Sequence, residues 1–266
     1  MMATDSWFFL VLTSVLSGLA ILWIVGGYYH IRYYVLRAHE PETWKCQPKR
    51  HLRPDQVRQA MRLSSMNLVI GGALSGTFIW ALLHDKFPIP VYLEVAEYGW
   101  TYTIFSSLLL FLLVDGLAYY AHRLLHVRVM FKNFHCWHHR YVATSPWVVT
   151  AMHPVEFLIF QGTTFIPLFI IPFWSGAVIF TYVYALVFNI IDHSGVKLYS
   201  RWPWQGATMY HDDHHLHFHV NFGQHLSFWD RFHNTHRRVG RRYGVDVFGG
   251  KGEPDGSGDK GELVRY

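Results

Sequence analysis

Histidines at metal-ligand spacing are the most informative feature of the sequence. His122 and His126 are four residues apart, so on a helix they would lie on one face, as two ligands of one metal must. Two later clusters, at residues 135–139 and 211–215, share the spacing H-x-x-H-H, and His153 and His193 stand alone between them. A lone histidine is usually a hydrogen-bonded surface or core residue. Burying many such rings beside apolar segments is costly unless they have a partner. The clusters therefore predict a metal site, although imidazole suits iron, zinc, copper and nickel alike and does not choose among them.

Asp115 is the first of two other polar residues that the spacing places near these histidines. It lies seven residues before His122, so on a helix the two side chains share one face. A carboxylate there could accept the second ring N–H of a ligating histidine and fix its tautomer, as is usual around bound metals. The alternative is that Asp115 is a charge at a helix end that reaches the membrane surface.

Asn189 is the second such residue. It lies four residues before His193, so the two side chains would point to the same face of a helix. An asparagine oxygen is a weaker metal ligand than imidazole, and we expect a hydrogen bond from Asn189 to a metal-bound water. The alternative is that Asn189 caps its helix or bonds to the backbone near Ser194.

The composition is that of a membrane protein. Hydrophobic residues make up 51% of the 266-residue chain and charged residues only 15%, which is too few charges for an ordinary soluble domain. Cys46 and Cys136 are too few and too far apart for a disulfide framework, so reduced thiols are expected. The net charge of +5 comes from basic residues beside apolar runs. This indicates membrane orientation and argues against nucleic acid as a partner.

Apolar runs predict an all-α integral membrane fold with about four transmembrane helices, the last pair a hairpin. Residues 7–29, 63–83 and 98–114 contain no charged residue and are long enough to cross a bilayer core of roughly 30 Å. For the first run a cleaved signal peptide is the alternative, but the usual basic segment before it is missing. The third run continues into Asp115 and His122 without a break, so it would carry the first histidine pair to the membrane surface.

Residues 157–191 form an uncharged run of 35 residues, which as one helix would extend roughly 52 Å, too long for a bilayer. Pro167, Pro172 and Gly176 near its middle instead predict a hairpin that enters and leaves on the same side. The basic residues 30–62 are expected to form a cytosolic connector, and the loop 84–97, with its single lysine, to lie on the opposite side. All histidine clusters then share one helical cap on the cytosolic face.

A single membrane-embedded domain is expected over residues 1–248, with a histidine-rich core at residues 115–235. The stretch from residue 249 to residue 266 is rich in Gly, Asp and Lys and is predicted to be a disordered tail.

The order of the histidine motifs resembles the fatty acid hydroxylase and sterol desaturase superfamily of membrane di-iron enzymes, over residues 115–235. Residues 122–126 are similar to the H-R-x-x-H box of that family, and residues 152–156 to the H-P segment of its sterol branch. Further matches are Asp192-His193-Ser194-Gly195, Asp213-His214-His215, Asn221-Phe222-Gly223 and Trp229-Asp230-Arg231. The chain departs from the family at His233-Asn234-Thr235, where a Gly-Thr pair is usual.

The resemblance implies that the histidine cap holds a dimetal site of two iron ions, which zinc could replace in purified protein, and that dioxygen is the oxidant. The matching positions assign ten histidines to these metals: His122, His126, His135, His138, His139, His153, His193, His211, His214 and His215. His217, His219 and His225 fall outside the pattern and are expected at the surface or around the ligands.

The resemblance also implies an oxidoreductase that desaturates or hydroxylates a lipid, most similar to the sterol C-5 desaturases. Fatty acid or sphingolipid hydroxylases and 4-methylsterol oxidases are the alternatives within the family, and these residues do not separate desaturation from hydroxylation. Electrons would come from an external donor, either cytochrome b5 with its reductase or a bacterial ferredoxin. The expected location is the endoplasmic reticulum membrane in a eukaryote or the inner membrane in a bacterium, with the active site on the cytosolic face.

Two alternatives come from other classes of protein. A metal transporter with histidine-rich loops would carry ionisable ligands inside its spans, and the runs between residues 7 and 114 contain none. A membrane haem protein would place its axial histidines within paired helices, and its absorption spectrum would identify it.

Overall fold

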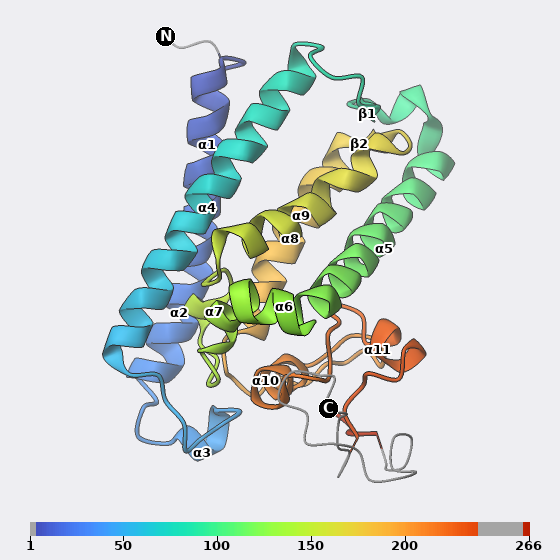
Figure 1. Ribbon diagram of the computed structural model, residues 1–266. Coiled ribbons are helices and arrows are strands. Elements are labelled where there is room, and N and C mark those ends of the chain that lie inside the picture. Colours follow the sequence, from blue (N-terminus) through green and yellow to red (C-terminus); the bar gives the residue numbers. More distant parts are fainter. Residues whose placement is uncertain (1–3, 239–262) are drawn as a thin grey trace.

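The computed structural model describes residues 4–238 and 263–266, which form a bundle of long helices with a cap of short helices at one end (Figure 1). The α-helices are α1 (Trp7–Ile21), α2 (Gly27–Tyr29), α3 (Pro41–Trp44), α4 (Pro54–Leu83), α5 (Gly99–Leu125), α6 (Arg128–Met130), α7 (Cys136–His139), α8 (Pro154–Phe165), α9 (Ser175–Asp192), α10 (Thr208–His217) and α11 (Phe228–Phe232). The π-helical turns are η1 (Leu22–Gly26), η2 (His30–Val35) and η4 (Phe131–His135), and the 3-10 turns are η3 (Val95–Glu97), η5 (Pro146–Val148) and η6 (Ile166–Phe169). Two short strands, β1 (Val91–Tyr92) and β2 (Phe173–Trp174), pair in parallel at the other end of the bundle.

The predicted all-α membrane fold is confirmed. Within the described residues four helices are long and apolar enough to cross a membrane, namely Trp7–Val35, Pro54–Leu83, Gly99–Leu125 and Ser175–Asp192. The third of these is continuous from its apolar start through Asp115 to His122, as the sequence predicted.

Two helix boundaries differ from the prediction. The first helix does not end at residue 29, because the π turn η2 continues it to Val35. The second begins at Pro54 rather than at residue 63, with proline in its first turn and the Gln56 side-chain oxygen accepting from the backbone N–H of Arg53 at 3.1 Å. Much of the basic connector predicted over residues 30–62 is therefore helical, and charge alone was a poor guide to where the helices begin and end.

Helices α1 and α4 pack closely because α4 presents glycines to the backbone of α1. A Cβ atom added at Gly72 would lie 2.6 Å from the Cα of Val15, and one added at Gly76 would lie 2.5 Å from the Cα of Val11. Real Cβ atoms do not approach backbone so closely, and small residues are how membrane helices achieve such contact.

The predicted hairpin is formed by α8 and α9. Helix α8 with the η6 turn spans Pro154–Phe169, about 24 Å at the usual rise, which is shorter than a bilayer core. Helix α9 returns to the end at which α8 began, so His153 and His193 flank the two arms at the same end (Figure 1).

The histidine-bearing segments gather at one end of the bundle. Helices α6, α7, α10 and α11 lie there, beside the carboxyl end of α5 and below α8 and α9 in Figure 1. Of the predicted tail, residues 249–262 lie outside the described residues. Tyr266 is described, and its hydroxyl lies 2.7 Å from both Asn221 Nδ2 and Asp213 Oδ2.

Candidate metal centre

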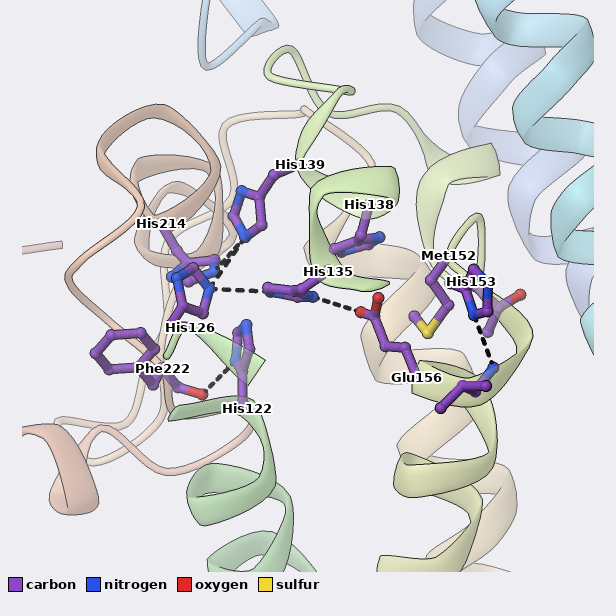
Figure 2. A network of polar contacts seen from close by, with 12 residues as sticks. His122, His126, His135, His138, His139, Met152, His153, Glu156, His214 and Phe222 are labelled. Atoms are coloured by element: carbon purple, nitrogen blue, oxygen red, sulfur yellow. Dashed lines mark hydrogen bonds and ion pairs between the residues drawn. The ribbon is translucent and has the colours of Figure 1, made fainter. Parts of the chain in front are cut away.

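Nine of the ten histidines expected as ligands come together in two buried groups. The first group consists of His122, His126, His135, His139 and His214, and the second of His138, His193, His211 and His215. In each group one ligand nitrogen per residue lies within 4.8 Å of all the others. Figure 2 shows the rings of the first group turned toward one another from α5, from the η4 and α7 segment, and from α10.

The Nε2 atoms approach as closely as the ligands of one metal do. In the first group the Nε2 atom of His126 lies 2.9 Å from that of His135 and 3.2 Å from that of His139. In the second group the Nε2 atom of His193 lies 3.2 Å from that of His138 and 2.9 Å from that of His211. Two nitrogens bound at right angles to a metal at about 2.1 Å are about 3.0 Å apart, so both groups fit an ion.

Several of the opposite ring nitrogens are held by acceptors. The Nδ1 atom of His122 lies 2.8 Å from the carbonyl oxygen of Phe222, and that of His214 lies 2.7 Å from the carbonyl oxygen of Val220. The Nδ1 atom of His193 lies 2.7 Å from the carbonyl oxygen of Asn189. Each acceptor holds the N–H on Nδ1, which leaves the Nε2 lone pair for a metal.

Burial keeps these imidazoles neutral. Desolvation lowers the pKa of His135 to about 3 and the pKa of His193 to about 4, and it lowers the pKa of His126 and His214 well below the ordinary value. A neutral imidazole binds a metal without first losing a proton. In the second group both ring nitrogens of His215 are buried without a hydrogen-bond partner among the described residues, and a metal would supply one.

Asp230, of the W-D-R motif, folds the loop that faces the first group. Its carboxylate accepts hydrogen bonds from the backbone N–H groups of Phe222 and Gly223 at 2.9 and 2.6 Å, and from the hydroxyls of Thr235 and Tyr210. This holds residues 220–223 so that their carbonyl groups meet His122 and His214. The N-F-G and W-D-R motifs therefore act together as one support.

The chain keeps a turn at residues 233–235 although Asn234 stands where the usual Gly-Thr pair has glycine. Asn234 has a φ of 57°, in the left-handed region where glycine is favoured and asparagine is the best tolerated substitute. Thr235, the second member of the pair, donates to Asp230 at 2.6 Å and lies 2.9 Å from the hydroxyl of Tyr119.

The hydrogen bonds of the Asp115 carboxylate in the described residues go to the segment 225–229. Its carboxylate accepts from the backbone N–H of His225 at 3.0 Å and from the indole N–H of Trp229 at 2.8 Å. The seven-residue spacing correctly placed Asp115 and His122 on one helix. It could not show that the segment 225–229 would fold back onto Asp115.

Glu156 is the carboxylate that meets a clustered histidine, and the sequence reading missed it. Its Oε1 atom lies 2.6 Å from the Nδ1 atom of His135, and both side chains are almost fully buried (Figure 2). The signal was present, because Glu156 is the only charge at the entrance to a long apolar run, and an acidic residue at such a place is usually functional.

His153 lies outside both metal groups, and Asn189 meets the second group through its backbone carbonyl. The Nδ1 atom of His153 accepts from the backbone N–H of Val155 at 3.1 Å and so caps α8, and the structure brings it into neither group. Asn189 lies on the wall of a cavity that also reaches His193, while its carbonyl oxygen faces the ring of that histidine. A hydrogen bond from its side chain to a metal-bound water stays a prediction.

Comparisons with known proteins relate this chain to fatty acid hydroxylases and sterol desaturases. Residues 107–235 match the family model described as fatty acid hydroxylase. A Delta(7)-sterol 5(6)-desaturase of Aspergillus fumigatus is 27% identical over 206 residues, which cover 69% of this chain and 64% of that protein. The lathosterol oxidase of Rattus norvegicus is 32% identical over 136 residues, which cover 50% of this chain and 45% of that protein. The chain thus spans about half the length of the curated relatives it matches. No solved structure matches it.

Proposed function

Because residues 107–235 match the fatty acid hydroxylase family model, we propose that this chain is a membrane oxidoreductase that desaturates a sterol in the manner of the C-5 desaturases. The observation that carries the proposal is the pair of buried histidine groups beside a cavity between α5, α8 and α9. The printed names of the matched relatives support a sterol as the substrate. Hydroxylation of a fatty acyl or sphingolipid chain, or oxidation of a 4-methylsterol, are the alternatives within the family.

Two iron ions, each held by one histidine group, would supply the oxidation of an unactivated C–H bond by dioxygen. The chain's own residues hold and orient the imidazoles through the carbonyl groups of Phe222, Val220 and Asn189 and through Glu156. Burial of both groups keeps water away from the reacting carbon. The apolar cavity walls, which include Val114, Phe157 and Leu186, would pack against the lipid.

The proposed electron donor is a separate redox protein, such as cytochrome b5 or a ferredoxin. A surface hollow supports this, because three exposed arginines against one carboxylate, Asp55, would attract an acidic protein. The arginines are Arg58, Arg62 and Arg140, and Trp137 also lines the hollow. Trp137 directly precedes His138 in the chain, and Arg140 stacks on its ring at 5.0 Å. A donor docked here would contact Trp137, the neighbour of His138 in the chain.

We further propose that the histidine end faces the cytosol, in the endoplasmic reticulum if the source is eukaryotic. The basic segment around α3 lies at that end, whereas the loop between α4 and α5 contains one lysine and three acidic residues. Basic residues flank membrane spans mainly on the cytosolic side.

Reconstitution tests the proposal. The purified chain would be loaded with iron, placed in lipid nanodiscs with cytochrome b5 and its reductase, and supplied with a Δ7-sterol. We expect an oxygen-dependent product with one more double bond by mass spectrometry. His126→Ala should abolish it, and the same change at the exposed His84 should not. Turnover of fatty acyl lipids with none of the sterol would favour the hydroxylase alternative.

A further inference from the structure

His225 lines the cavity between α5, α8 and α9 and belongs to neither histidine group. Histidines of both groups line the same cavity. His225 is only 5% exposed, and its Nδ1 atom has no hydrogen-bond partner in the part of the chain that the structure describes. A buried polar atom without a partner costs roughly 1–3 kcal/mol, so a group that supplies the hydrogen bond would be bound favourably.

The ring of His225 is held in place by aromatic side chains. Phe111 of α5 and Tyr184 and Phe188 of α9 surround it, with ring centroids 5.9, 5.2 and 4.9 Å away. Its backbone N–H is fixed by Asp115, which also accepts from the indole of Trp229. This arrangement accounts for a buried carboxylate on α5 that contacts no histidine ring of the metal groups.

We propose that the His225 imidazole is the hydrogen-bonding partner for the hydroxyl group of the lipid substrate. This rests on the proposed function, in which the substrate is a sterol. The ring and the hydroxyl complement each other, because a neutral imidazole has one N–H donor and one acceptor nitrogen and an alcohol can meet either. Burial lowers the pKa of His225 to about 3, so the ring is neutral at physiological pH.

The chemistry of a sterol agrees with this position. Its single hydroxyl group is on the same ring as carbon 5, so a residue that binds the hydroxyl while carbon 5 reacts must share the cavity with the metal ligands. His225 does so. Two other polar side chains on the cavity wall contact the protein: the Oε1 atom of Glu156 meets His135, and Gln161 donates to Ser75 at 3.4 Å.

Binding measurements on the iron-loaded protein in nanodiscs test the inference. The two probes are a Δ7-sterol and its 3-deoxy counterpart, each competing with a fluorescent sterol. The wild type should bind the hydroxylated probe about 2- to 10-fold more tightly, the range expected for one hydrogen bond. His225→Phe keeps a flat ring among the aromatic neighbours and should bind both probes equally. His225→Gln should retain part of the preference, and the exposed His84→Phe should retain all of it.

Metal content, measured in the same samples, should be unchanged by the His225 substitutions. If His225→Phe still prefers the hydroxylated probe, the hydroxyl is bound elsewhere and this inference is wrong, although a sterol substrate stands. If the wild type binds sterols without preferring the hydroxyl, the inference is equally wrong. If the wild type binds and converts no sterol, the proposed function fails first and the role of His225 falls with it.

Discussion

Replacement of Glu156 tests how the metal groups are supported. The Oε1 atom of Glu156 lies 2.6 Å from the Nδ1 atom of His135, with 0% and 1% of the two side chains exposed. Loss of such a partner usually weakens metal binding by about 10- to 100-fold, which is about 1.4–2.8 kcal/mol. Glu156→Gln keeps an acceptor oxygen of similar size at this place, whereas Glu156→Leu removes the acceptor altogether. We therefore expect Glu156→Gln to weaken metal binding by about 10-fold and Glu156→Leu by about 100-fold.

The assay is a zinc titration of the metal-free protein against a competing chromophoric chelator, with stoichiometry taken from elemental analysis. Circular dichroism and gel filtration report whether each variant is folded. Glu42→Gln is the matched control, because Glu42 is exposed on α3 at the same end of the molecule. It should bind zinc as the wild type does.

Asp115→Asn provides the contrast. The Asp115 carboxylate contacts the segment 225–229 and no ring of either metal group, so zinc affinity should stay close to that of the wild type. Wild-type affinity in Glu156→Leu, or a larger loss in Asp115→Asn than in Glu156→Leu, would contradict this account of the site.

Three further predictions concern other parts of the chain. Burial raises the pKa of the Cys46 thiol to about 12, so at pH 8 about one molecule in ten thousand is thiolate. Maleimide should therefore modify Cys46 more slowly than Cys136 until urea unfolds the protein. Equal rates in the folded protein would contradict this. Gly76→Leu should lower the midpoint temperature of thermal unfolding, because the added side chain would separate α1 from α4. Gly27→Leu should not, because Gly27 has open space around it. Equal midpoints for the two variants would refute the packing argument. Arg58→Glu should slow reduction by cytochrome b5 and weaken its salt dependence, and an unchanged rate would exclude the arginine hollow as the docking site.

The sequence predicted the helices and the gathering of histidines better than it predicted their supports. Histidine spacing on α5 and α10 depends only on helix geometry, so His122, His126, His211 and His214 could be placed from local pattern. The partner of a ligand is different, because it comes from a distant segment. Glu156 meets His135 from the first turn of α8, a separate helix, and no spacing rule connects them.

The loop between α7 and α8 shows the same dependence on distant residues. It carries few side chains that a motif search would notice, yet α4 holds its backbone from inside the bundle. Asn67 donates to the carbonyl groups of Thr150 and Met152 at 2.8 and 3.0 Å, and Ser64 donates to that of Trp147 at 2.7 Å. Polar residues three apart in an apolar span were visible in the sequence, and such residues usually face the bundle interior. Their partners became known only from the fold.

The structure also changes what the motifs mean. In N-F-G and W-D-R no side chain reaches a ring nitrogen of the metal groups through a hydrogen bond in the described residues. Asp230 instead binds backbone N–H groups of Phe222 and Gly223, and the carbonyl oxygen of Phe222 then meets His122. Asn221 in turn donates to the carbonyl of Tyr210 on α10. Because α10 carries His211, His214 and His215, the two motifs join α5 to α10 and so fix the distance between the first histidine box and the last. A metal held by ligands from both helices needs that distance to be constant.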